Sequence, residues 1–188
     1  LSLVQLPPVV KVGPDSYRPH DSRLSLDLVV CARTAIIADV ARRLKPDVLL
    51  VDHSPAGMGG ELLEVFAMLR RDRACTRVAL GLRDVLDEPQ AVLRSWSKQG
   101  IHELLDQVYH EVYVYGQRDM LAVGSAYGMH SSVSRRLQYC GYLDKPGAAP
   151  CDRTRRRGSF LLATAGGGGD GHDVLMAARD AGARIGLE

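Results

Sequence analysis

Short apolar runs alternate along the chain with stretches in which apolar residues recur every three or four positions. A continuous apolar run predicts a buried strand, and a spacing of three to four predicts an amphipathic helix. Strands are predicted at residues 3–6, 48–51, 77–82 and 111–115, and helices at 26–44, 61–71, 88–108 and 131–136. Strands and helices that alternate in this way form βα units. The predicted fold class is therefore α/β, a Rossmann-like parallel sheet with helices on both faces.

Local signals mark the ends of some of these elements. Ser25 is the predicted N-cap of the first long helix. Asp87 is the predicted cap of a helix that has a proline in its first turn and Gln90 at the capping-box position. Residues 48–51 are apolar at every position, which predicts a strand buried on both faces. Residues 13–23 are polar and predict a loop.

The best domain boundary lies at residues 145–158, which are rich in proline, glycine, alanine and arginine and have no apolar period. This segment predicts a linker between a first domain, 1–144, and the first βα unit of a second domain, 159–188. The chain does not begin with methionine, and residues 183–186 have the pattern of a new strand. We therefore expect a piece of a longer protein.

Composition and charge narrow the function classes. The 188 residues are 46% hydrophobic and 24% charged, which is enough to bury a core. The net charge of +2 gives no support for a nucleic-acid partner. A local cluster of arginines predicts a solvated linker. The alternative is that the cluster contacts a nucleotide or a lipid headgroup, which would allow peripheral membrane association. The cluster comprises Arg153, Arg155, Arg156 and Arg157.

Targeting and metal-binding signals are absent from the sequence. No apolar run is long enough to span a bilayer and no secretory signal opens the chain, so we expect a cytoplasmic protein. The four cysteines are scattered, and their spacing to one another and to the histidines does not resemble a zinc site. They are predicted to be reduced or buried thiols, and no metal is expected.

Polar residues gather where three predicted strands end, at 52–55, 81–84 and 116–119. Ligands of an open parallel sheet bind outside the carboxyl ends of its strands. The pattern Gly-x-Arg-Asp occurs at two of these ends, at 81–84 and 116–119. Each Arg-Asp either contacts a ligand or forms an ordinary structural pair, and the sequence leaves both alternatives open.

The loop after residues 48–51 is the most site-like of the three. Gly59 and Gly60 open the next helix, where backbone N–H groups favour an anion or a hydroxyl-rich ligand. His53 is a candidate general base, because imidazole titrates near neutral pH, and Glu61 stands in the first turn of the helix. In the structural alternative, His53 hydrogen-bonds the loop and Glu61 only complements the helix dipole.

Four consecutive glycines, 166–169, follow a second apolar run and precede Asp170 and a helical pattern. A strand, a glycine loop and a helix together form a phosphate cradle. The loop also satisfies G-x-G-x-x-G, with Glu188 placed as a ribose-binding acid, which keeps an NAD(P)- or FAD-dependent oxidoreductase as an alternative. Three observations count against the oxidoreductase. A run of four glycines matches many patterns by chance, and Glu188 resembles a vector-encoded end. The later βα units of a dinucleotide-binding domain do not follow in this sequence.

The order of these features resembles the MurG-type GT-B glycosyltransferases (glycosyltransferase family 28) over roughly residues 45–175. Residues 45–60 are similar to that family's Pro-Asp-Val strand and glycine-containing acceptor loop, and the strand ending at Asp84 is similar to its next strand. Residues 139–142 resemble the strand and turn that close its first domain, and 165–171 its Gly-Gly-Ser-x-Gly loop. Gly168 replaces the serine, and Tyr142 and Leu143 replace an Asn-Pro, which indicates a distinct branch.

The resemblance implies two Rossmann-like domains that face each other across a cleft, with 1–144 as an incomplete acceptor-side domain and 159–188 as the start of the donor-binding domain. It implies transfer of a sugar from a nucleotide-diphosphate donor, most often a UDP-sugar, to an acceptor hydroxyl, with no cofactor and no obligatory metal. We expect the chain alone to be inactive, because most of the donor domain lies outside it. A non-catalytic nucleotide-sugar-binding module remains an alternative.

Site residues follow from the same comparison of motifs. The catalytic candidates are His53 and Glu61. The candidates for the acceptor cleft are Ser54, Gly59, Gly60, Arg83 and Asp84. The candidates for the donor diphosphate are Gly166, Gly167, Gly168, Gly169 and Asp170.

Overall fold

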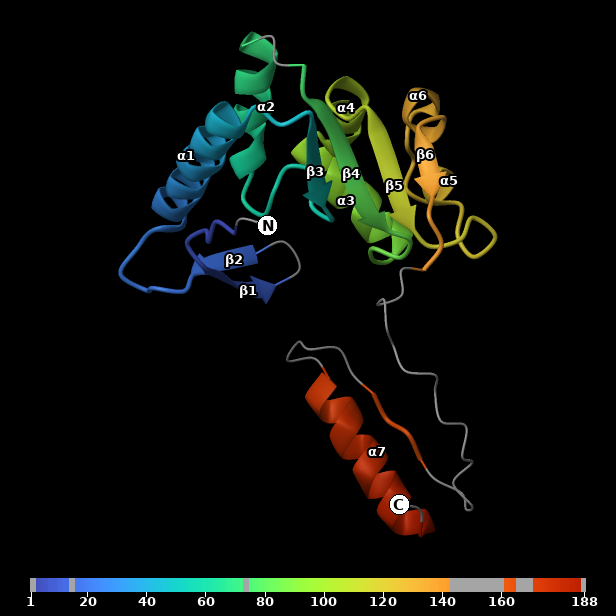
Figure 1. The fold of residues 1–188 in the computed structure, drawn as a ribbon. Coiled ribbons are helices and arrows are strands. Elements are labelled where there is room, and N and C mark those ends of the chain that lie inside the picture. The colour runs from blue at the N-terminus through green and yellow to red at the C-terminus, as the bar shows by residue number, and fades with distance from the viewer. Residues whose placement is uncertain (1–2, 14–15, 73–74, 143–160, 165–170, 187–188) are drawn as a thin grey trace. The chain divides into compact units, whose positions relative to one another are not determined.

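The computed structural model describes residues 3–13, 16–72, 75–142, 161–164 and 171–186. The chain divides into two compact units, Leu1–Asp144 and Lys145–Glu188. In the first unit (Figure 1) the elements are β1 (Val9–Gly13), β2 (Ser16–Pro19), α1 (Leu26–Leu44), β3 (Val48–Asp52), α2 (Glu61–Arg71), β4 (Arg77–Arg83), α3 (Pro89–Gln99), α4 (Ile101–Gln107), β5 (Glu111–Tyr115), α5 (Val123–Ala126), α6 (Ser131–Ser134) and β6 (Leu137–Tyr139). The second unit contains α7 (His172–Ile185). The acceptor-side and donor-side roles given to these parts stay predictions.

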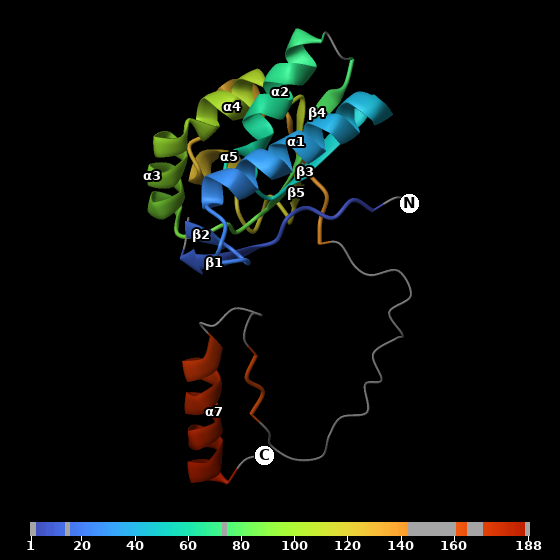
Figure 2. The same ribbon diagram turned by 90° about the vertical axis from the view of Figure 1, so that its left-hand side faces the viewer.

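The four strands β3, β4, β5 and β6 form one parallel sheet in that order. Val51 lies opposite Leu80 in the register, and Leu80 lies opposite Val112. The helices α2, α3 and α4 run along this sheet (Figures 1 and 2). A parallel sheet flanked by helices confirms the predicted α/β, Rossmann-like fold class.

The main core joins one face of the sheet to the helices. Leu80, Leu82 and Val114 are fully buried against side chains such as Phe66 and Leu105. A second, smaller cluster packs α1 onto α2 and consists of Ala38, Ala41, Val65, Met68 and Leu69. Burying a large apolar side chain contributes about 1.5–3 kcal/mol. The two clusters therefore give the strand ends and the loops that follow them a firm support.

The strand β3 lies at the edge of the sheet, not in its centre. Val48 and Leu50 are 56% and 58% exposed, and only Val51 of this strand is buried. The prediction of a strand buried on both faces is therefore wrong. Its side chains alternate between the core and solvent, although the sequence is apolar at every position. An apolar run alone does not distinguish a central strand from an edge strand.

The N-terminal segment also differs from the prediction. Residues 3–6 form no strand, and the first strand is β1, which pairs antiparallel with β2. The strand β2 lies inside the segment 13–23 that was predicted to be a loop. Pro7 and Pro8 lack the N–H groups that a strand donates, so the chain enters the sheet pairing only after them. The resulting hairpin lies beyond the carboxyl ends of the parallel strands (Figure 1).

The helix caps were predicted in part. Ser25 caps α1 as expected, and its Oγ accepts a hydrogen bond from the Leu28 N–H at 3.2 Å. At α3 the cap is Glu88, not Asp87, because the Glu88 carboxylate accepts from the N–H groups of Gln90 and Ala91. The single helix predicted over 88–108 is two helices. Gly100, with φ 66°, ends α3 and starts α4.

In the second unit, α7 confirms the predicted helical pattern. Residues 161–164 have no regular secondary structure. The strand predicted at 183–186 is wrong, because Ala183–Ile185 belong to α7 and Gly186 is its left-handed C-cap. The donor-diphosphate candidates Gly166, Gly167, Gly168, Gly169 and Asp170 lie outside the described residues.

Candidate functional site

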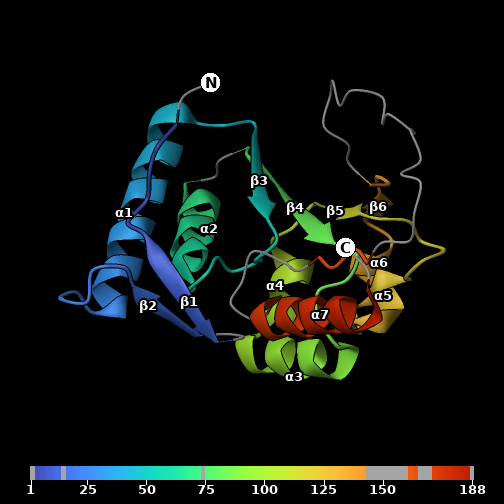
Figure 3. The same cartoon turned by 90° about the horizontal axis from the view of Figure 1, so that it is seen from below.

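The carboxyl ends of the four parallel strands meet at one edge of the sheet, seen from below in Figure 3. His53 follows β3, Asp84 follows β4, Gly116 follows β5 and Tyr142 lies three residues after β6. The N–H of Gly141 donates to the Gly116 carbonyl at 3.0 Å, so the chain after β6 stays against the end of β5. The edge therefore brings together most of the strand-end residues that the sequence singled out.

His53 is held in an unusual backbone conformation. Its φ is 64°, and its N–H donates to the Gly81 carbonyl at 2.8 Å. Partial desolvation of the imidazole lowers its pKa, as do the positive charges of Arg83 and Lys11, and these effects outweigh the opposing charge of Asp52. A non-glycine residue with positive φ is uncommon and is often found where a site fixes a side chain. The lowered pKa favours the neutral form of the imidazole at the strand ends.

Arg83 and Asp84 do not pair with each other. The Asp84 carboxylate accepts from the Val85 N–H at 2.8 Å and from the Tyr142 hydroxyl at 3.0 Å. Arg83 is exposed, and within the described part of the chain its guanidinium makes no hydrogen bond or ion pair. Asp84 thus joins the ends of β4 and β6. The positive charge of Arg83 lies close enough to His53 to lower its pKa.

Asp84 also explains the glycine that follows β5. A Cβ added to Gly116 would lie 2.5 Å from the Asp84 Cβ, so no larger residue fits without a shift of the backbone. In the second Gly-x-Arg-Asp sequence, Arg118 and Asp119 are both exposed, and no ion pair joins them. The arginine and the aspartate therefore do not pair with each other in either Gly-x-Arg-Asp sequence.

Glu61 is buried and fully engaged. It is 3% exposed, and its Oε1 accepts from the Nε and Nη2 of Arg33 at 3.1 and 3.0 Å. Its Oε2 accepts from the Gly59 N–H at 2.7 Å. Burial raises the pKa of Glu61, but the hydrogen bonds from Gly59 and Arg33 outweigh this and lower it. The catalytic role stays a prediction, and these contacts favour a structural role for the carboxylate.

The same carboxylate occupies the start of α2. The N–H groups of Gly59, Leu62 and Leu63 all have partners within the chain, namely Glu61 Oε2 and the carbonyls of Ala56 and Gly60. An external anion would have to displace these partners. The anion-binding role predicted for Gly59 and Gly60 is therefore not favoured by this geometry.

Steric demands account for the glycines of this loop. A Cβ added to Gly59 would lie 2.6 Å from the Val30 Cγ2, and Gly60 has φ 85°. Gly57, in the same loop, has φ 80°, and a Cβ added there would lie 2.8 Å from the Glu61 Cδ. Ser54 donates its hydroxyl hydrogen to the Gly57 carbonyl at 2.7 Å. The loop is therefore a tightly fixed support for His53.

Three residues of this region were not predicted from the sequence. Arg33 lies in α1, 28 residues before its partner Glu61, and nothing in the local pattern marks the pair. Lys11 and Tyr17 come from the β1–β2 hairpin and line a cavity of about 220 Å³ together with His53 and Ser54. A local signal exists in the apolar residues Val9, Val10 and Val12, but this run is too short to predict a hairpin.

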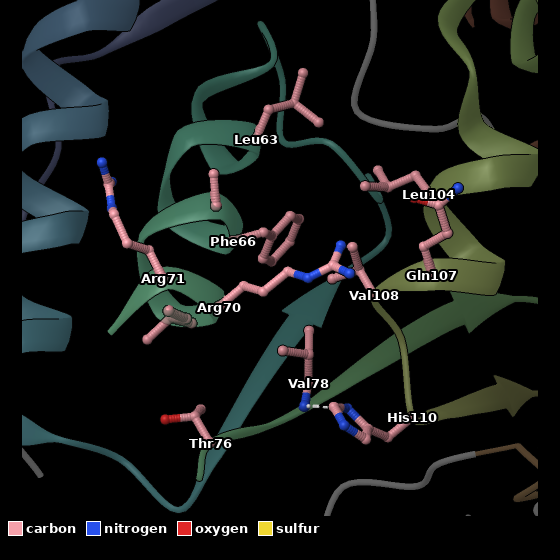
Figure 4. Close-up of a pocket in the computed structure, with 12 residues that line it drawn as sticks. Leu63, Phe66, Arg70, Arg71, Thr76, Val78, Leu104, Gln107, Val108 and His110 are labelled. Atoms are coloured by element: carbon pink, nitrogen blue, oxygen red, sulfur yellow. Dashed lines mark hydrogen bonds between the residues drawn. The ribbon is translucent and has the colours of Figure 1, made fainter. Parts of the chain in front are cut away.

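A larger cavity of about 710 Å³ lies between α2 and α4, at the amino end of β4. Figure 4 shows its apolar side chains Phe66, Val78 and Leu104, with Arg70 reaching across from α2. The Nδ1 of His110 accepts from the Val78 N–H at 3.0 Å, so this histidine is tied to the strand. None of the predicted site residues that the structure describes lies there.

The described residues contain no group of three or more His, Cys, Asp or Glu side chains arranged to hold a metal ion. The three cysteines among them, Cys31, Cys75 and Cys140, are free and exposed. In the same parts of the chain, every helix is too short or too polar to cross a membrane. Comparison of the chain with protein-family models, with curated proteins and with solved structures gave no match.

Proposed function

We propose that the chain acts as part of a glycosyltransferase, which moves a sugar from a nucleotide-diphosphate donor, a UDP-sugar in the first instance, to an acceptor hydroxyl. One observation carries the proposal. At the carboxyl ends of a parallel sheet, where such folds bind ligands, the exposed imidazole of His53 is held at a φ of 64° and has a lowered pKa, close to Arg83, whose charge has no partner among the described residues. The resemblance to MurG-type enzymes supplies the reaction class.

In this proposal His53 is the general base. Its unprotonated nitrogen accepts the proton of the acceptor hydroxyl while the oxygen forms a bond to the anomeric carbon of the donor sugar. The bond between that carbon and the diphosphate oxygen breaks, and the nucleoside diphosphate leaves with the electron pair. The imidazolium then returns its proton to water. A general base of this kind accelerates a reaction by about 10²–10⁴-fold.

The remaining residues support this step. Arg83, a candidate for the acceptor cleft, supplies a positive charge that acts on His53. Asp84 and the Glu61–Arg33 pair hold the strand ends and the His53 loop in place. The resemblance assigns the diphosphate to Gly166–Gly169, beside Asp170, and involves neither a cofactor nor an obligatory metal.

The test is release of nucleoside diphosphate from UDP-, GDP- and TDP-sugars by the full-length protein. His53→Gln is expected to lower kcat by about 10²–10⁴-fold, the contribution of a general base. Arg71→Ala, at the opposite end of the sheet, is the control and should keep the wild-type rate. Thermal stabilisation by NAD(P) alone would contradict the proposal. Binding of UDP-sugars without transfer would indicate a non-catalytic module instead.

A further inference from the structure

The cavity between α2 and α4 has no part in the proposed transfer reaction. It lies at the amino end of β4, and its volume is about 710 Å³. Cavities of roughly 300–1,000 Å³ enclose a whole small molecule. The cavity is therefore large enough for a complete ligand, at the end of the sheet opposite to His53.

The walls of the cavity are mostly apolar. Phe66 and Val78 are each 5% exposed, and Leu104 lines the cavity from α4 (Figure 4). On α2, Leu63 lines the cavity and is 47% exposed. The Phe66 ring packs edge to face on Tyr109, with the ring centroids 5.7 Å apart, which holds it in place. An apolar ligand body gains free energy here because it removes this surface from water.

One arginine crosses the apolar cavity. Leu63, Phe66 and Arg70 follow one another at helical spacing and so share one face of α2. The Arg70 side chain extends from this face towards Val108, at the end of α4 (Figure 4). Among the described residues, its guanidinium makes no hydrogen bond or ion pair, and no aspartate or glutamate lines the cavity. A guanidinium in this position can bind the carboxylate of a ligand through two parallel N–H bonds.

Neutral donors line the same cavity. The Nδ1 of His110 accepts from the Val78 N–H at 3.0 Å, so the proton of the neutral ring lies on Nε2, which is a donor. The side-chain amide of Gln107, on α4, supplies a second donor. A ligand group that carries only acceptor oxygens, such as a carboxylate, matches this set.

We propose that this cavity binds an aromatic carboxylic acid, with its ring against Phe66 and Leu104 and its carboxylate on the Arg70 guanidinium. Arginine favours this class of ligand, because its planar group pairs with a carboxylate and also stacks on an aromatic ring. The site goes beyond the proposed transferase function, and neither of the two depends on the other.

The direct test is calorimetric titration of the 188-residue chain with 2-naphthoate, an aromatic carboxylate of two fused rings. Two probes divide its chemistry: 2-naphthalenemethanol keeps the rings without the charge, and acetate keeps the charge without the rings. The alcohol should bind about tenfold or more weakly than naphthoate, since hydrogen bonds to a charged group are lost. Acetate should show no measurable binding. Equal affinities for naphthoate and the alcohol would overturn the inference.

Two adjacent arginines provide a matched pair of variants. Arg70→Ala should weaken naphthoate binding by about tenfold or more. Arg71 carries the same charge on the same helix, but its side chain points away from Phe66 (Figure 4). Arg71→Ala should therefore change the affinity by less than about twofold, because an exposed charge outside the contact is screened by salt. Equal losses for the two variants, or no loss for Arg70→Ala, would overturn the inference.

A second pair of variants changes the cavity from a position that is already half exposed, so the fold should survive both. Leu63→Glu places a carboxylate beside the ligand and should weaken naphthoate binding by about tenfold or more, because like charges repel. Leu63→Gln removes the same apolar side chain without adding a charge and should weaken it clearly less. Similar affinities for the two variants would contradict a charged ligand group in this cavity.

NMR of the backbone amides shows at which end of the sheet naphthoate binds. On titration of the wild-type chain, the signals of Val78 and Leu104 should shift, and those of Lys11 and Tyr17, in the cavity at the carboxyl end, should stay in place. Shifts confined to Lys11 and Tyr17 would place the ligand at the other end of the sheet and overturn the inference.

Discussion

The two ends of the parallel sheet carry cavities that differ in size and in lining. At the amino end, the cavity is about 710 Å³ and is lined by apolar side chains such as Phe66 and Leu104, together with Arg70 and Arg71, which make no hydrogen bond or ion pair among the described residues. At the carboxyl end, the cavity is about 220 Å³, and Lys11 in its wall and Arg83 beyond it make no hydrogen bond or ion pair among the described residues. Both ends therefore carry cations with no partner among the described residues, and the candidate site is distinguished by His53, with its φ of 64°, and by its place at the carboxyl ends of the strands.

The ion pairs at the two ends differ in burial. The Glu61–Arg33 pair at the carboxyl end has side chains that are 3% and 16% exposed, whereas the Arg77–Glu111 pair is 58% and 28% exposed. A buried pair is costly to break because one partner is left as an uncompensated charge, but an exposed pair contributes little. The carboxyl end is therefore fixed from within, while its outer charges stay open to a ligand.

The largest expected effect comes from breaking the buried pair. Glu61→Gln leaves Arg33 buried without its partner and should lower the free energy of unfolding by about 3–5 kcal/mol. Arg77→Gln, at the amino end, should lower it by only about 0–1 kcal/mol. Urea denaturation of the 188-residue chain measures both. Similar losses for the two variants would remove the distinction between the ends.

A smaller effect is expected from the glycine after β5. Gly116→Ala places a Cβ 2.5 Å from the Asp84 Cβ, and this overpacking should cost about 1–3 kcal/mol of unfolding free energy. Gly13→Ala in the hairpin is the matched control, because its nearest neighbour, the Ser16 Cβ, would lie at an ordinary 3.4 Å. Denaturation midpoints should fall clearly for the first variant and hardly for the second. Equal midpoints would show that the strand ends are not tightly packed.

The smallest effect is a dependence of stability on pH. The pKa of Glu61 is lowered in the folded chain, so the stability that its charge supplies is present above the ordinary carboxyl value of 4.5 and is lost as pH falls below it. Unfolding free energies measured between pH 7 and pH 3 should show this loss in the wild type. The Glu61→Gln variant should show a shallower decline over the same range. Parallel curves would mean that Glu61 keeps an ordinary pKa.

The regular part of the fold could be predicted from the sequence. Helix α2 begins at Glu61 and ends at Arg71 as expected, and β5 spans Glu111–Tyr115 as expected. Their apolar periods are strong, and their ends carry polar residues. The single glycine at 100 was not recognised as a helix break, because its left-handed φ depends on how α3 and α4 pack.

The site was only partly predictable. His53, Arg83 and Asp84 were found because they follow strands whose carboxyl ends must share an edge. The partners of these residues were not found, since Tyr142 lies 58 residues after Asp84 and the fold alone brings them together. Glu61 was predicted as a catalyst because its partner Arg33 is also distant in the sequence. The pairing of the two side chains favours a structural role for Glu61.

The central claim is that the carboxyl end of the sheet, at His53, performs the chemistry. The most direct measurement is the rate of sugar transfer from a UDP-sugar by full-length His53→Gln, beside full-length Arg71→Ala and wild type, each confirmed as folded. We expect a loss of about 10²–10⁴-fold in kcat for His53→Gln, as for the removal of a general base, and a wild-type rate for Arg71→Ala. A folded His53→Gln variant with the wild-type kcat would contradict the account.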